Sequence, residues 1–182
     1  MKSVLISIQP KWVNKIVSGE KTIEVRKTRP KLETPFKCCI YETTAKYKTR
    51  LLGLNCTCQG KGKVIGEFVC DKIYNLFPFA MGTGIELLDE LVSPEMFCKE
   101  SCLTEQEICD YIGEKDGYGW HISNLKIYDK PKELSEFGNL CRKDCLRLGK
   151  GKSCEFLSTN GTPCNRIIPI KRPPQSWCYV EG

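Results

Sequence analysis

The stretch SGEKTIEVRK, residues 18–27, decides how the chain is interpreted, because it joins a predicted short helix to a predicted strand. Gly19 is of the residue type that most often ends a helix. Residues 22–26 then alternate between polar and apolar side chains, which is typical of a half-buried strand. The alternation predicts that Ile23 and Val25 face a hydrophobic core.

The other face of this predicted strand is polar. Lys21, Glu24 and Arg26 place a basic, an acidic and a second basic side chain at fixed spacing. One interpretation is a solvated strand face, which is what most runs of charge are. The other is a ligand cradle, because two cationic donors beside a carboxylate suit a phosphate group or the edge of a base.

Together with Gly19, these residues spell G-x-K-x-x-E-x-R, and on this motif the chain resembles the ASCH domains, a branch of the PUA-like β-barrel superfamily. The flanking sequence agrees at the family's first strand, first helix and a later barrel strand, which correspond to residues 4–8, 10–18 and 66–70. The resemblance covers roughly the first 130 residues, a common size for a small domain. It implies a small barrel with a cleft beside the motif, and it implies binding of RNA or of a nucleotide.

The same resemblance leaves an enzymatic function open, because some relatives are hydrolases: an amidohydrolase of acetylated cytidine and a ribonuclease. In the amidohydrolase relatives a threonine stands where this chain has Glu24, so their nucleophile does not carry over, whereas their lysine aligns with Lys21. If the chain is a hydrolase, we expect Lys21 to activate a nucleophile or stabilise an oxyanion, and Glu24 to be the base. A third alternative is a small protein-interaction module that uses the same cleft.

The composition allows one domain with an appendage. The chain has 182 residues, a formal net charge of +6 and a hydrophobic fraction of 41%. This charge permits an anionic partner such as RNA. No run approaches the roughly 20 apolar residues that a membrane-spanning helix needs, and the first two residues lead into a predicted strand and not into a signal region. We therefore expect a cytoplasmic protein without a membrane partner.

Five further residues are candidate ligand contacts. Gln9 lies at the exit of the first predicted strand, where its amide would read a base edge. Trp120 and His121 follow glycines on a later predicted strand, where an aromatic face would stack with a base; the alternative is a structural role for this single histidine. Ser176 and Trp177 follow a proline pair in a stiff loop over the cleft, and the alternative is that Trp177 plugs the barrel.

Two segments between the predicted barrel strands have other patterns. Residues 85–92 carry apolar side chains at helical spacing and predict a short helix, and residues 104–112 begin with a capping-box signature. We therefore expect a helical insertion over about residues 77–115. Residues 44–63 are rich in Lys, Gly and Thr and predict a mobile loop.

Thirteen cysteines in a chain predicted to be cytoplasmic favour metal binding for some of them and burial for the rest. The best metal candidates are Cys141, Cys145, Cys154 and Cys164, which lie among Lys, Gly and Asn residues with few apolar neighbours. We expect structural zinc to fold this segment into a knuckle whose basic residues contact phosphate; the alternative is a set of scattered reduced thiols. Metal binding stays open for Cys56, Cys58, Cys98 and Cys102.

The sequence thus predicts an α+β protein. Residues 1–134 are expected to form a PUA-like small β-barrel with flanking helices. Residues 135–182 are expected to form a cysteine-rich appendage with a zinc knuckle and a proline-containing tail that packs back on the barrel. The leading predicted function is binding of RNA or of a modified nucleotide in a cleft lined by the G-x-K-x-x-E-x-R motif.

Overall fold

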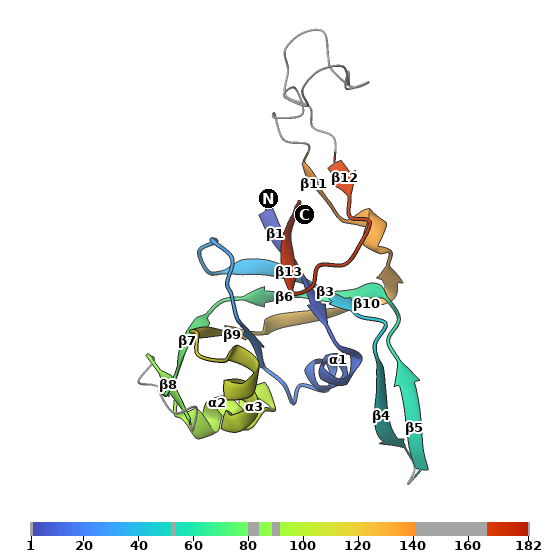
Figure 1. Cartoon of the computed structure of the whole chain (residues 1–182). Helices are drawn as coiled ribbons and strands as arrows, with labels where there is room; N and C mark the ends of the chain where they lie inside the picture. The colour runs from blue at the N-terminus through green and yellow to red at the C-terminus, as the bar shows by residue number, and fades with distance from the viewer. Residues whose placement is uncertain (1, 52–53, 80–83, 89–91, 141–166, 182) are drawn as a thin grey trace, which may run out of the picture.

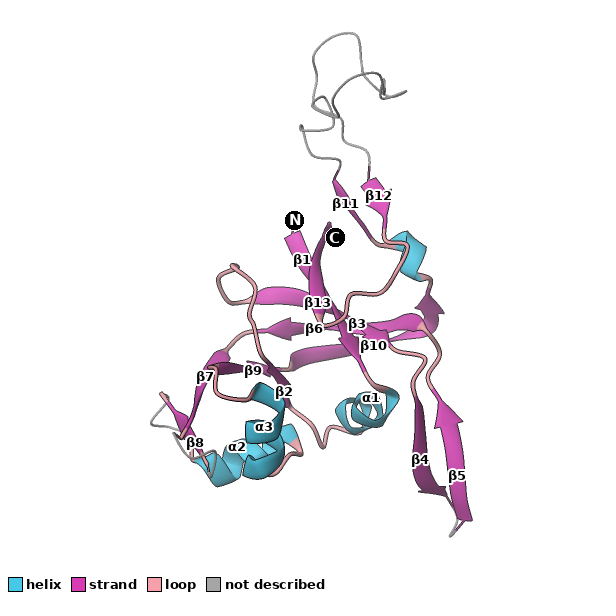
Figure 2. Ribbon diagram, viewed as in Figure 1, coloured by secondary structure: helices cyan, strands magenta, loops and turns pink. Residues whose placement is uncertain are grey.

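The structure is a computed structural model that describes residues 2–51, 54–79, 84–88, 92–140 and 167–181. These residues form two main β-sheets, two separate strand pairs, three α-helices and one short 3-10 helix (Figures 1 and 2). None of the described helices has the length and apolar character needed to cross a bilayer.

The larger sheet contains both ends of the described chain. Its five strands are, in spatial order, β10 (Ser123–Lys132), β6 (Lys63–Cys70), β3 (Phe36–Glu42), β1 (Lys2–Ile8) and β13 (Trp177–Glu181). Neighbours are antiparallel except β1 and β3, which are parallel. Because β13 pairs with β1 as far as Ile6↔Trp177, the residues just before β13 lie beside the end of the first strand.

The smaller sheet carries the charged motif and two of the helices. Its strands are, in spatial order, β2 (Ile23–Arg26), β9 (Gly117–His121), β7 (Ile73–Pro78) and β8 (Ile85–Leu87). Helices α2 (Pro94–Ser101) and α3 (Glu105–Ile112) pack on one face of this sheet, and α1 (Pro10–Val17) connects β1 to β2. The predicted capping box is present at the start of α3, where Thr104 and Glu107 bond each other's backbone N–H.

Strand β2 has an apolar face and a polar face. This alternation of side chains confirms the prediction that Ile23 and Val25 face a hydrophobic core. Ile23 and Val25 belong to the apolar cluster between this sheet and helices α2 and α3, which includes Phe97 and Ile108. Glu24 and Arg26 line the opposite side. The main core fills the space between the two sheets, and Trp120 is its largest fully buried side chain.

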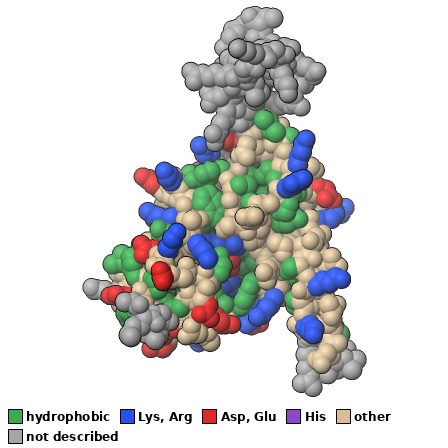
Figure 3. All heavy atoms as spheres, in the orientation of Figure 1, with side chains coloured by type: hydrophobic (Ala, Val, Ile, Leu, Met, Phe, Trp, Pro, Cys, Tyr) green, Lys and Arg blue, Asp and Glu red, His purple; other side chains and the backbone are tan. Residues whose placement is uncertain are grey.

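Two strand pairs stand apart from the main sheets (Figure 2). Strands β4 (Lys46–Leu51) and β5 (Leu54–Gln59) form a hairpin that we call the arm, and basic side chains lie along it on the face shown in Figure 3. Strands β11 (Gly138–Leu140) and β12 (Ile167–Pro169) follow the short helix η1 (Leu134–Glu136) and pair at Leu140↔Ile167.

Two sequence predictions are wrong and one is not confirmed. The expected helix over 85–92 begins instead as strand β8, because Ile85 completes the apolar cluster beneath β7; residues 89–91 lie outside the described residues. The expected loop over 44–63 contains the arm, because its half-buried and exposed residues alternate with the period of a strand. A closed barrel is not confirmed, since the described strands form separate sheets.

Candidate functional site

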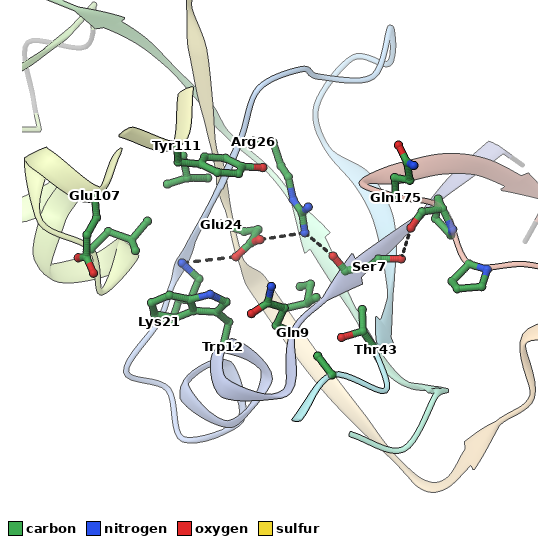
Figure 4. A pocket seen from close by; sticks show the side chains of 16 residues that line it. Ser7, Gln9, Trp12, Lys21, Glu24, Arg26, Thr43, Glu107, Tyr111 and Gln175 are labelled. Atoms are coloured by element: carbon green, nitrogen blue, oxygen red, sulfur yellow. Dashed lines mark hydrogen bonds and ion pairs between the residues drawn. The ribbon is translucent and has the colours of Figure 1, made fainter. Parts of the chain in front are cut away.

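A pocket of about 690 Å³ lies where β1, α1, β2, α3 and the C-terminal tail meet (Figure 4). Its walls combine charged, amide, hydroxyl and aromatic groups, which is the composition expected for a site that binds a polar ligand with a planar part. The lining residues are Ser7, Ile8, Gln9, Trp12, Lys21, Glu24, Val25, Arg26, Thr43, Ala45, Leu103, Glu107, Tyr111, Pro173, Pro174 and Gln175.

Lys21 is fixed at both its backbone and its ammonium group. Gly19, at φ 78°, turns the chain at the end of α1, and the Lys21 backbone N–H donates to the Lys15 carbonyl. Lys21 Nζ donates to the carbonyl of Ser101 at 2.6 Å. Ser101 is the last residue of α2, where unpaired carbonyls and the helix dipole favour a cation.

Glu24 joins the two cations into a charged row, by which we mean Lys21, Glu24 and Arg26. Its carboxylate oxygens lie 3.4 Å from Lys21 Nζ and 2.9 Å from an Arg26 terminal nitrogen (Figure 4). The three side chains are only 2%, 8% and 8% exposed. The row therefore has a formal charge of +1 in a nearly buried position, which favours an anionic or electron-rich guest.

Arg26 also ties β2 to the start and the end of the chain. One terminal nitrogen donates to the Ser7 carbonyl at 2.6 Å, and the other lies 3.4 Å from Ser176 Oγ. Ser7 in turn donates its hydroxyl proton to the Pro174 carbonyl at 2.6 Å. These bonds hold the tail residues in place as one wall of the pocket.

Two polar atoms at the pocket are buried without a partner. Among the described residues, neither Arg26 Nε nor Thr43 Oγ1 has a hydrogen-bond partner, although both residues line the pocket. Leaving such a group unsatisfied costs roughly 1–3 kcal/mol, so each would gain from a bond to a ligand that a small movement of its side chain brings within reach. Arg26 Nε can only donate, whereas the Thr43 hydroxyl can donate or accept.

Aromatic side chains with cations beside them line two parts of the pocket. Trp12 lies on α1, and the ammonium groups of Lys21 and Lys11 are 5.2 and 4.4 Å from its ring centroid. Tyr111 lies on α3, with Lys27 Nζ 5.2 Å from its ring centroid. Figure 4 shows these rings on either side of Glu24 in that view, so a planar ligand above the charged row would have an aromatic neighbour.

The pocket contains half of the residues predicted to bind ligand. Gln9, Lys21, Glu24 and Arg26 line it, whereas four others lie elsewhere: Trp120, His121, Ser176 and Trp177. Contact between these four residues and a ligand therefore stays a prediction.

Each of the four has another environment. Trp120 is 0% exposed and lies in the core. Its ring centroid is 5.9 Å from that of Trp177. The indole N–H of Trp177 donates to Thr28 Oγ1 at 3.0 Å. His121 Nδ1 lies 2.6 Å from an Asp71 carboxylate oxygen. Burial opposes ionisation of Asp71, but the hydrogen bond and charge of His121, together with bonds from the Asp71 backbone and Ser123, outweigh it, so the pKa of Asp71 is below its usual value. Ser176 contacts two residues of the pocket: its hydroxyl lies 3.4 Å from an Arg26 terminal nitrogen, and its carbonyl accepts from the Ser7 backbone N–H at 2.9 Å.

The predicted metal ligands Cys141, Cys145, Cys154 and Cys164 lie outside the described residues. Within the described ranges, no group of three or more His, Cys, Asp or Glu side chains is arranged to hold a metal ion, and this covers the other four candidate cysteines. Cys102, for example, donates its thiol proton to the Glu20 carbonyl.

Sequence reasoning missed Ser7, Thr43 and Tyr111. Tyr111 lies on α3 and also lines the pocket, and no motif in the sequence marks it. Ser7 and Thr43 lie near the ends of β1 and β3 and belong to no motif, so the sequence carries no local signal for them.

The fold and the motif together define the class of protein. The family model for the ASCH domain matches residues 6–131, and the chain belongs to the ASCH domain family. A search of curated proteins finds no match.

Solved structures with a similar fold include an ASCH protein from Zymomonas mobilis. That structure is 18% identical, with a TM-score of 0.54, and the match covers 98% of this chain and 87% of that chain. A point variant of the Zymomonas protein matches at 19% identity and a TM-score of 0.55, covering 100% of this chain and 91% of that chain. Similarity at this level of identity concerns the fold.

Proposed function

We propose that this protein binds RNA, and that the pocket holds one nucleotide, which is either a standard or a modified one. Membership of the ASCH family is consistent with this proposal. The observation that carries it is the charged row: three nearly buried ionic groups with a formal charge of +1 line a cavity beside an unpaired Arg26 Nε. A solvated strand face would not bury these side chains.

The chemistry of the pocket suits the parts of a nucleotide. Arg26 Nε supplies a donor for a base carbonyl or a phosphate oxygen, and the Glu24 carboxylate accepts from a base amino group. The amides of Gln9 and Gln175 can pair with either edge of a base. Trp12 offers an aromatic surface for stacking, which accepts any base.

The geometry argues against Lys21 as a nucleophile or a base and against Glu24 as a base in a hydrolase. A lysine that acts as a nucleophile or a base must present a free amine. Lys21 instead donates to the Ser101 carbonyl at 2.6 Å and lies 3.4 Å from Glu24, so it is anchored as a cation. Glu24 is likewise held between two cations and is poorly placed to accept a proton from a substrate.

The cysteine-rich segment belongs to the same proposal as a structural zinc knuckle. Support comes from the spacing of Cys141, Cys145, Cys154 and Cys164. The pairing of Leu140 with Ile167 brings the two ends of the 141–166 segment together, which lowers the entropy that a metal must overcome to close it.

Thr43→Val provides a direct test of the pocket. The substitution keeps the shape of the side chain and removes a buried hydroxyl without a partner, so the free energy of unfolding should be unchanged or slightly higher. Affinity for a fluorescent RNA of mixed sequence, measured by anisotropy at low salt, should fall. The control is Ser135→Ala, which removes an exposed hydroxyl group from η1 and should leave the affinity for RNA unchanged.

Two outcomes would reject the proposal. If the protein binds neither RNA nor nucleosides at low salt, the pocket is not a nucleotide site. If instead it converts RNA or acylated nucleosides to products, and Lys21→Met abolishes this turnover, the hydrolase alternative is correct.

A further inference from the structure

The arm projects from the body of the protein (Figures 1 and 2), and those of its residues whose burial is described are half-buried or exposed. A hydrogen bond of 2.5 Å joins Asn14 Nδ2 of α1 to the hydroxyl of Tyr47 in β4 and fixes its orientation. Two-stranded hairpins are marginally stable by themselves, so an arm of this kind usually acts by contacting something else. Six residues in each strand give it a reach of roughly 20 Å.

The arm is basic and contains no acidic residue. Residues 43–62 include four basic residues, Lys46, Lys48, Arg50 and Lys61, and no Asp or Glu, whereas the whole chain has a net charge of only +6. This segment, about a ninth of the chain, therefore has a formal charge of +4 with no acidic residue to offset it. Charge distributed in this way favours a binding surface over general solubility.

The cations occupy one face of the arm. Lys46 and Lys48 are exposed and lie opposite the neutral residues Gln59 and Thr57 in the pairing of β4 with β5. Neither lysine has an ion pair with any residue that the structure describes. Alternate residues of a strand lie about 7 Å apart, so these ammonium groups form a row that an extended polyanion can follow.

The arm starts at the pocket. Thr43 and Ala45, which lead into β4, line the pocket wall, and the Gly60 backbone N–H closes the base of the arm by donating to the Ala45 carbonyl at 3.2 Å. A Cβ atom at Gly60 would lie 1.8 Å from the Thr43 carbonyl oxygen. The close approach of these two backbone segments therefore requires glycine at position 60. The base of the arm and the pocket wall are thus one rigid unit.

We propose that the arm binds the phosphate backbone of RNA beside the nucleotide held in the pocket. The ligand is then a nucleotide within an RNA strand and not a free nucleotide. This inference rests on the proposed function and narrows its ligand class. The pocket supplies contacts to one nucleotide, and the arm supplies a row of cations that contacts its neighbours without reading their sequence.

The test compares a strand with a single nucleotide. Anisotropy and calorimetry would measure the affinity of the full chain for an RNA of about twelve nucleotides and for a 5′-mononucleotide mixture. The arm variant is Lys46→Gln with Lys48→Gln. Its matched control is Lys115→Gln with Lys130→Gln, which removes the same charge from exposed positions outside the arm.

We expect the wild-type protein to bind the RNA more tightly than the mononucleotides. In the arm variant the RNA affinity should fall roughly tenfold, as expected for two exposed ionic contacts. The slope of log K against log salt concentration should fall by about 1.4, because each phosphate contact of a single strand contributes roughly 0.7. Mononucleotide affinity should stay unchanged, and the control variant should behave as the wild type.

Other results separate this inference from the proposed function. If Thr43→Val weakens RNA binding but the arm variant binds RNA with wild-type affinity and salt slope, the arm lysines only protect the free strand edges, and the inference is wrong while the function stands. If the arm variant loses binding to phosphatidylserine vesicles and keeps its RNA affinity, the arm binds a membrane surface and the inference is equally wrong. If neither RNA nor mononucleotides bind, the proposed function itself fails.

Discussion

Replacing Glu24 by Gln should destabilise the protein more than any other conservative change in the pocket. The substitution keeps the size of the side chain and removes the one negative charge between Lys21 and Arg26. At an effective dielectric constant of about 20, Coulomb's law gives roughly 6 kcal/mol for the 2.9 Å contact to Arg26 and roughly 5 kcal/mol for the 3.4 Å contact to Lys21.

Desolvation of the three ions offsets much of this attraction in the wild-type protein. It does not disappear in the variant, because both cations stay nearly buried without an anion. Breaking a buried ion pair in this way costs about 3–5 kcal/mol, a large part of the 5–15 kcal/mol that stabilises a typical domain. Equilibrium unfolding in urea at neutral pH would measure the loss. Glu133→Gln is the control, because its pair with Lys63 is exposed and should contribute less than about 1 kcal/mol.

The complementary variant removes all three charges together. Lys21→Met, Glu24→Leu and Arg26→Met should recover a large part of the loss, because no buried ion then lacks a partner, while the carbonyls of Ser101 and Ser7 lose their donors and keep the recovery incomplete. The same triple variant should lose RNA binding. If Glu24→Gln unfolds within about 1 kcal/mol of the wild type, the charged row is hydrated in solution and the reasoning from its burial is refuted.

Three further predictions concern other parts of the chain. Burial disfavours the charged form of Glu67, but the hydrogen bonds from Lys37 and Tyr128 and the nearby lysine charges together outweigh it and lower the pKa of Glu67, while the bond between Lys37 and Glu67 raises the pKa of Lys37. The stability that Glu67 contributes is therefore fully present above its unfolded-state pKa of about 4.3. It is lost as the pH falls through the lower pKa that Glu67 has in the folded state. In a plot of melting temperature against pH, Glu67→Gln should therefore reduce the slope on the acid side. In Gly119→Ala the new Cβ would lie 2.5 Å from a Phe97 ring carbon, which should cost roughly 1–3 kcal/mol in urea unfolding, and Phe97→Leu should recover part of the loss. Elemental analysis of purified protein should find bound zinc, and Cys154→Ser should lower it; an equal metal content in the two proteins would contradict the predicted knuckle.

Local patterns in the sequence predicted what depends on neighbours along the chain. The alternation around Ile23 correctly separated the core face of β2 from the polar face that carries Glu24. Thr104 and Glu107 correctly marked the start of α3, because a capping box needs only residues three apart. The ASCH motif is similarly local, which is why it was recognisable without the fold.

Features that depend on tertiary position were predicted less well. The sequence predicts Trp120 as a stacking surface because an aromatic face accepts any base, whereas in the structure β9 runs between β2 and β7 and this ring lies in the core. Thr43 joined the pocket only because β3 passes beside β1, a parallel pairing that no local pattern encodes. The Lys, Gly and Thr content of residues 44–63 predicts a loop, and it obscures the strand alternation of the arm.

The motif alone does not make the pocket, because its cations need acceptors that the motif does not contain. Lys21 uses the carbonyl of Ser101, which is free because α2 ends there. Arg26 uses the carbonyl of Ser7, which lies just past the last β1–β13 pair, where the Ser7 N–H still donates to the Ser176 carbonyl and the Ser7 carbonyl accepts from Arg26. The same three charged side chains on a strand without these two carbonyls would extend into solvent. The site therefore depends on where a helix and a strand pairing end, and this is why burial of the charged row separates a ligand pocket from an ordinary polar face.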